Sequence, residues 1–154
     1  MEAQVRNWIL LLAALVAAAS IFLWPRSDGF RLSDLSPQKV SSIRVEKQGM
    51  PEISLERKGD SWEIVAPKRG DAKMEAVKKI LSILEARSDQ KLDAGNLARF
   101  GLDKPELRVD FDDVEFDFGI LNPLTGQQYV KCGNAVYLVS AKYALIPSLG
   151  DIHA

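Results

Sequence analysis

The chain has 154 residues, and its 20 Lys and Arg residues and 21 Asp and Glu residues leave a formal net charge of −1 at pH 7. The basic residues are dispersed along the sequence, which argues against nucleic acid as a partner. The single cysteine, Cys132, excludes an internal disulfide and a multi-cysteine metal site. The single histidine, His153, is the penultimate residue, where we expect a frayed end. Because neither residue supports a Ser-His-Asp triad or a Cys-His pair, we predict no enzyme activity, no metal site and no cofactor.

Residues 7–24 form an uncharged run rich in Leu and Ala. At about 1.5 Å per residue, a helix of this length reaches ~27 Å, close to the ~30 Å hydrocarbon core of a bilayer. Trp8 and Trp24 would lie at the two membrane interfaces. Ala13 and Ala17 have the four-residue spacing that lets two membrane helices approach closely, so they are candidate partner contacts. The sequence therefore predicts a transmembrane signal anchor over residues 1–25.

A cleaved secretory signal is the alternative to an anchor, because residues 17–19 are three consecutive alanines that resemble a cleavage site. Apolar residues resume at Ile21, so cleavage there would leave an apolar, aromatic new terminus, which favours the uncleaved form. The Lys and Arg bias does not decide the orientation. The short N-terminal flank is easily left in the cytoplasm. We therefore expect a single span that places the C-terminal domain on the opposite side of the membrane from the cytoplasm.

Residues 26–39 carry Ser, Asp, Gly and Pro and predict a tether, and residues 40–154 are enough for one α+β domain with a real core. Residues 40–47 alternate apolar and polar side chains, as a half-buried strand does. Two further alternating runs flank a turn at Gly59 and predict a β-hairpin with Trp62 on its core face.

A helix is predicted over residues 72–87, with Asp71 as its N-cap. Apolar residues at helical spacing would face the sheet, and Glu75 and Lys79 would pair on the solvent side. A second helical turn over residues 94–100 is expected to end at Gly101 in a left-handed Schellman cap.

Two alternating runs after Pro105 predict a hairpin that turns at Asp112 and Asp113. In this register Phe111 lies opposite Val114, Val109 opposite Phe116, Leu107 opposite Phe118, Arg108 opposite Asp117, and Asp110 opposite Glu115. One face of the hairpin then becomes wholly apolar.

The same hairpin gathers acidic residues at its tip, and these are candidate partner contacts: Asp110, Asp112, Asp113, Glu115 and Asp117. A solvated acidic edge that discourages edge-to-edge pairing is one interpretation. A docking surface for a basic partner and a divalent cation site are two others. The spaced Asp and Asn loop with Gly that supplies calcium ligands is missing from the sequence.

Gly133 and Asn134 predict a two-residue turn between strands over residues 128–132 and 135–140, with Cys132 opposite Ala135. Cys132 is then a small strand residue, with a reactive thiol as the alternative. A last short helix is expected after Ser140. The whole predicts an antiparallel meander of six or seven strands packed by one main helix.

Several segments together resemble one known family. They are the W-x-I-x-x-P pattern from Trp62 to Pro67, the helix after it, the segment Phe100-Gly101-Leu102-Asp103-Lys104-Pro105, and the paired strands at residues 128–131 and 135–139. Over roughly residues 40–149 the chain is similar to the bacterial domain of unknown function family DUF4340, in a single copy. The resemblance implies a membrane-anchored cell-envelope protein, in some members associated with ABC-type transporter systems, and it carries over no catalytic residue.

We therefore expect a single-pass protein of the bacterial inner (cytoplasmic) membrane with a periplasmic domain. It would be a non-catalytic accessory or scaffold subunit that docks on another membrane assembly, with an envelope or transporter protein as its partner. The alternative is an envelope module that binds a lipid or other small molecule on the concave side of the sheet, for which the many inward Phe and Ile residues are the motive.

Overall fold

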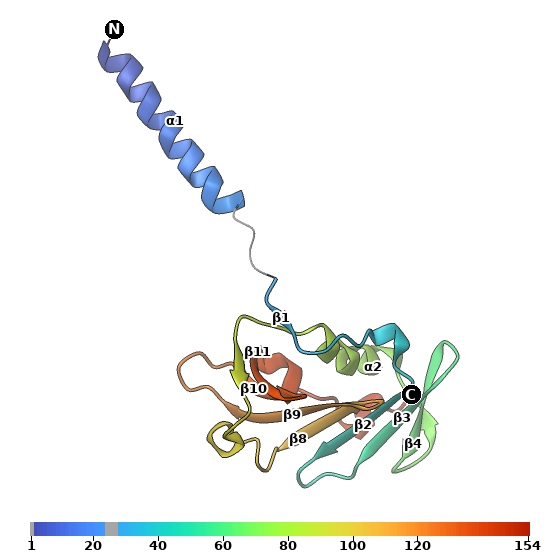
Figure 1. Ribbon diagram of the computed structural model, residues 1–154. Helices are drawn as coiled ribbons and strands as arrows, with labels where there is room; N and C mark the ends of the chain where they lie inside the picture. The colour runs from blue at the N-terminus through green and yellow to red at the C-terminus, as the bar shows by residue number, and fades with distance from the viewer. Residues whose placement is uncertain (1, 24–27) are drawn as a thin grey trace.

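The computed structural model describes residues 2–23 and 28–154 (Figure 1). Helix α1 (Glu2–Leu23) precedes an α+β domain. Among the described residues, no helix combines the length and the apolarity needed to cross a bilayer. Trp24, at one end of the predicted span, lies outside the described residues, and so does the side chain of Ala17.

The domain is built on one antiparallel sheet of nine strands in the order β5-β4-β3-β2-β8-β9-β10-β11-β7. The strands are β2 (Ser42–Lys47), β3 (Ile53–Lys58), β4 (Ser61–Ala66), β5 (Gly70–Asp71), β7 (Lys91–Asp93), β8 (Leu107–Phe111), β9 (Val114–Leu121), β10 (Gln128–Cys132) and β11 (Ala135–Val139). The predicted antiparallel sheet is confirmed, and the short outer strands β5 and β7 are additional to it. Eight of the nine strands form two meanders, β2 to β5 and β8 to β11, which are joined where β2 pairs with β8, and β7 pairs with the outer side of β11.

The registers of the two predicted hairpins are confirmed. Phe111 lies opposite Val114 across the β8–β9 turn, and Cys132 lies opposite Ala135 across the β10–β11 turn. Asp112 adopts a left-handed conformation with φ of 53° in the first turn, which Asp tolerates better than most residues do.

Helix α2 (Met74–Leu81) covers one face of the sheet and continues as the short 3-10 helix η2 (Ser82–Glu85), so the helix predicted over residues 72–87 is shorter than expected. Asp71 is not its N-cap. Asp71 lies in β5 opposite Glu63, and Lys73 occupies the cap position without a side-chain bond. The sheet holds this segment extended because the amide of Ala72 donates to the carbonyl of Trp62 at 2.9 Å. Glu75 contacts Lys78 at 3.7 Å, three residues along the helix, in place of the predicted partner Lys79.

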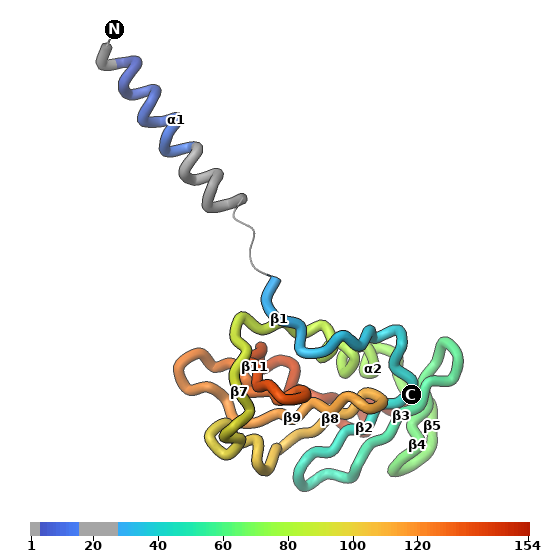
Figure 2. The backbone as a smooth tube through the Cα atoms, viewed as in Figure 1, coloured from blue at the N-terminus to red at the C-terminus, as the bar shows by residue number. Residues whose placement is uncertain are grey.

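Much of the predicted tether is folded onto the domain. β1 (Phe30–Arg31) pairs with β6 (Arg87–Ser88), and the chain then runs across the α2 side of the sheet through the 3-10 helix η1 (Pro37–Lys39) (Figure 2). Leu32 and Val40 on this segment are buried in the main core. Arg57 fixes it, because its Nε donates to the Val40 carbonyl at 2.7 Å and its Nη2 to the Pro37 carbonyl at 3.0 Å.

The C-terminal residues are docked, so the expectation of a frayed end at His153 is wrong. The short helix α3 (Leu149–Ile152) begins with a capping box between Ser148 and Asp151, and Ile152 is fully buried. His153 bridges to Ala72, and the Ala154 amide donates to the Asp71 carbonyl at 2.8 Å. These hydrogen bonds satisfy backbone groups beside the start of α2, which is why the segment does not fray.

Two cores lie on the two faces of the sheet. The main core lies between the sheet and α2, and Trp62 and the hairpin phenylalanines belong to it. A smaller core covers Val136 on the opposite face of β11 with Phe100 and Leu102 from the 3-10 helix η3 (Leu97–Phe100) and the turn after it. Gly101 ends η3 at φ +68°, and the Leu102 amide donates to the Leu97 carbonyl at 2.9 Å, as the predicted Schellman cap requires. The predicted helix after Ser140 is the 3-10 helix η4 (Ala141–Ala144), which Ser140 precedes without a side-chain cap bond.

Replacing Trp62 with Ala should lower the free energy of unfolding by about 3–5 kcal/mol, because this large side chain is only 2% exposed and Arg57 stacks over its ring at 4.7 Å. Urea denaturation of the full chain measures the change. Met50→Ala, at an exposed position on the β2–β3 turn, is the control and should change stability little. Equal stability of the Trp62→Ala variant and the parent would contradict this placement of the side chain.

Candidate functional site

Charged side chains form a row across the middle of the sheet on the face opposite α2. The sheet register places Glu46 of β2 beside Arg108 of β8, Arg108 beside Asp117 of β9, and Asp117 beside Lys131 of β10. Their neighbours along each strand, such as Val45 and Val109, point into the main core, so alternation turns this charge row to the other face. The signs alternate along the row, which makes each neighbouring pair favourable.

Arg108 is at the centre of this charge row. Its Nε contacts Asp117 Oδ1 at 2.7 Å and its Nη2 contacts Asp117 Oδ2 at 3.3 Å, a bidentate pair. Asp117 is only 4% exposed, so the guanidinium supplies the partner that a buried carboxylate needs. The hydrogen bond to Asp117 raises the pKa of Arg108, although burial acts in the opposite direction. Glu115 contacts the same guanidinium at 3.5 Å.

The structure divides the predicted acidic cluster into side chains with different surroundings. Asp112 binds backbone, since its Oδ1 accepts from the amides of Ser41 at 3.1 Å and Ser42 at 2.9 Å. Asp117 is the buried partner of Arg108, and Asp113 is exposed in the turn. The interpretation as a protective sheet edge is wrong, because β8 and β9 are central strands. Within residues 2–23 and 28–154, no three His, Cys, Asp or Glu side chains are grouped to hold a metal ion.

Asp110 and Glu115 are the like-charged pair that the hairpin register predicts, and they lie opposite each other. Burial raises the pKa of Asp110, opposed by the charge of Arg108, and one of its carboxylate oxygens is buried without a hydrogen-bond partner. Burial and then the negative charge of Asp117 raise the pKa of Glu115. The pairs along the charge row therefore attract each other, whereas Asp110 and Glu115, which lie beside the row, repel each other.

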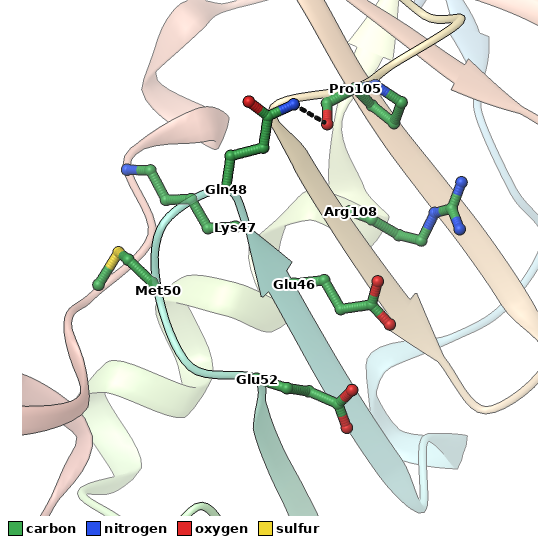
Figure 3. Close-up of a pocket in the computed structure, with 7 residues that line it drawn as sticks. All are labelled: Glu46, Lys47, Gln48, Met50, Glu52, Pro105 and Arg108. Carbon is green, nitrogen blue, oxygen red and sulfur yellow. Dashed lines mark hydrogen bonds between the residues drawn. The ribbon is translucent and has the colours of Figure 1, made fainter.

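A shallow hollow of about 480 Å³ lies at one end of the charge row, where the β2–β3 turn meets the start of β8 (Figure 3). Its lining residues are Glu46, Lys47, Gln48, Met50, Glu52, Pro105 and Arg108. Figure 3 shows Glu46, Glu52 and Arg108 extending to one side of β2, and Lys47 and Met50 extending to the other. The Gln48 side chain donates to the Pro105 carbonyl at 3.3 Å, which links the β2–β3 turn to the segment that precedes β8.

A second hollow of about 360 Å³ continues along β2 and β3 on the same face, where Arg44, Glu56 and Asp110 contribute to its lining. Arg44 contacts Glu52 at 3.5 Å, so the two hollows share one network of charges. We name the two hollows with the charge row the charged face. Its exposed carboxylates and guanidinium groups can form ion pairs and hydrogen bonds with a polypeptide laid across it.

The sequence did not reveal Glu46, Glu52 or Lys131 as members of a site. Its hairpin register did place Arg108 opposite Asp117, but the pairing of β2 with β8 joins segments that are distant in the sequence. The available signal was the alternation of charged and apolar residues over residues 42–47. This alternation shows which side of the strand faces solvent, but it does not show which strand lies next to it.

Cys132 is buried in β10, and burial raises the pKa of its thiol from 9.0 to about 11. Since the thiolate is the reactive form, burial and the raised pKa favour Cys132 as a small strand residue over the alternative of a reactive thiol.

Comparison with known proteins gives one match. The family model for a domain of unknown function, DUF4340, matches residues 62–153. The chain belongs to the DUF4340 family. No curated protein and no solved structure is found that matches it.

The DUF4340 match begins in β4 and includes β8 to β11, so it contains Arg108, Asp117 and Lys131. β2 and β3 precede the matched region, although β2 supplies Glu46 and pairs directly with β8. The charged face therefore combines a part that belongs to the DUF4340 match with a part contributed by this chain's preceding strands.

Asp110→Asn should change how stability depends on pH. A carboxyl with a raised pKa keeps its proton in the folded chain at pH values where the unfolded chain has lost it, so stability falls as pH rises from 3.8 through the raised pKa. The variant lacks this loss, and its unfolding free energy relative to the parent should increase between acidic and neutral pH.

Denaturant unfolding at several pH values measures this difference. Asp113→Asn is the matched control, since it removes one exposed negative charge from the turn of the same hairpin. Asp110→Asn and Asp113→Asn variants with the same pH profile would contradict the assignment of the effect to the half-buried carboxyl of Asp110.

Proposed function

We propose that this protein is a membrane-anchored, non-catalytic accessory or scaffold subunit of the bacterial cell envelope that docks on another membrane protein assembly. The charged face is the observation that carries the proposal. An ABC-type transporter is the partner class suggested by the family resemblance. The domain would stand on the periplasmic side of the inner membrane, attached by the N-terminal segment.

The N-terminal segment supports the anchor. Residues 7–24 carry no charge and are rich in Leu and Ala, and a helix of this length would reach ~27 Å at about 1.5 Å per residue, close to the ~30 Å apolar core of a bilayer. The Trp8 side chain is well exposed, as is expected of a residue that would meet the interfacial layer of a membrane. The alanines at positions 13 and 17 would leave room for a neighbouring helix.

The charged face supports a protein partner in place of a small molecule. Its hollows are open and polar, and their charged groups come from adjacent strands of a well-packed sheet. A surface of this kind favours recognition by complementary charge, which directs association and orientation. The exposed side chains of Glu46 and Glu52 give it acidic groups that a basic segment of a partner could bind.

A lipid or small-molecule module has less support. The inward phenylalanines that motivate this alternative, Phe111, Phe116 and Phe118, are all packed in the main core. An apolar hollow lined by Val45, Ile53 and Ile146 holds only about 20 Å³, which is room for about one water molecule.

Charge reversal on the charged face tests the docking proposal. The full-length Glu46→Lys variant should lose the protein that co-purifies with the parent from native membranes after crosslinking. Glu75→Lys is the control, because Glu75 is exposed like Glu46 but lies on α2, on the other side of the sheet. Mass spectrometry of the retained proteins gives the readout.

A partner retained by both variants would contradict docking through the charged face. A parent protein that purifies alone from crosslinked membranes would contradict the accessory-subunit proposal itself and would direct attention to bound lipids.

A further inference from the structure

The loop between β9 and β10 exposes an apolar side chain at its tip. Leu124 is 92% exposed, and Ile120 and Leu121 at the end of β9 are about half exposed. Residues 118–130 contain no charged side chain, in a chain of which 27% is Asp, Glu, Lys or Arg. This loop can therefore enter an apolar or interfacial environment without removing a charge from water.

Hydrogen bonds around Asn122 hold the loop in one conformation. Asn122 Oδ1 accepts from the amide of Leu124 at 2.9 Å and from that of Thr125 at 3.4 Å, and the Asn122 carbonyl accepts from the Gly126 amide at 2.8 Å. Asn122 Nδ2 donates to the hydroxyl of Tyr129 at 3.1 Å. Leu124 is thus presented by an ordered turn, which lowers the entropy lost when it is buried by another surface.

A short series of contacts links the loop to the strand with which the domain begins after the N-terminal segment. Phe30 pairs with Ser88, Ser88 Oγ accepts from the Leu138 amide at 3.1 Å, and Leu138 lies opposite Tyr129, which binds Asn122. An unbroken series of contacts therefore connects the first strand of the domain to the loop. Phe30 is itself half exposed.

The connection to α1 is short. Phe30 follows Leu23 by seven residues, so even a fully extended chain spans no more than about 25 Å between them. If α1 is the membrane anchor, this limit keeps Phe30, and the edge of the domain on which it pairs, within about 25 Å of the end of the anchor.

We propose that the β9–β10 loop, with Leu124 at its tip, inserts into the lipid interface of the bilayer and forms a second membrane contact beside the anchor. This inference rests on the proposed membrane anchoring. The occupant is lipid because the loop is uncharged, protrudes with aliphatic side chains and is linked by contacts to the strand that the anchor tethers. Two contacts would hold the domain in a defined orientation, with the charged face presented to a partner.

The test uses the full-length protein in liposomes of phosphatidylethanolamine and phosphatidylglycerol, with an environment-sensitive fluorophore on Leu124→Cys. Lipids carrying a quencher near the headgroup should reduce its fluorescence, and the emission should shift to shorter wavelength. Asp60→Cys, in the exposed β3–β4 turn toward the opposite edge of the sheet, is the control and should be unaffected. The unsubstituted chain reports any labelling of the buried Cys132.

Flotation of the liposomes separates the two proposals. A protein that floats with the liposomes but shows the same fluorescence at both positions, with and without quencher, would overturn insertion of the loop and leave the anchor intact. A protein that does not float would overturn the anchor, and the loop contact would fall with it.

Discussion

The pairing of β2 with β8 is the constraint on which the rest of this domain depends. It joins two meanders that each close through local turns, and it brings together residues such as Ile43 and Phe111, which lie 68 positions apart. On one face the pairing aligns apolar side chains over α2. On the other it sets Arg44 beside Asp110 and Glu46 beside Arg108. The core and the charged face are therefore two consequences of one strand register, since a shift by one residue would exchange them.

Arg108 shows how the charged face is stabilised. Its guanidinium binds the buried carboxylate of Asp117 and approaches Glu115, while Glu46 lies on its other side. Removing this guanidinium would leave Asp117 buried without its cationic partner, which costs more than the pair itself contributes. The exposed charges at the ends of the network are the ones that remain available to a partner, and this division between structural and available charge is the basis of the proposed docking role.

Local sequence signals predicted the fold where contacts are local. The turns at Asp112 and Gly133 fix the registers of their hairpins, because a short turn leaves the strands little freedom to slide. Asp71 was wrongly predicted to be a helix N-cap. Its backbone is bound by β4 and by the C-terminal residues, and helix-cap preferences take no account of such distant contacts. Likewise, nothing in the sequence indicated that the tether and His153 are bound. The tether pairs with β6 and His153 bridges to Ala72, both of which are distant in the sequence. The acidic cluster illustrates the same limit: its composition was visible, but the partners of Asp112 and the central position of β8 were not.

Native-state hydrogen exchange on the full chain tests most directly whether the β2–β8 pairing makes one sheet of the two meanders. The backbone amides of β2 and β8 should open with the same free energy as those of β3 and β9, and that energy should equal the one measured by global unfolding. If the amides of β2 to β4 instead exchanged through a separate opening of lower free energy while β8 to β11 stayed protected, the two meanders would be independent units. The account of a single register that creates both the core and the charged face would then be contradicted.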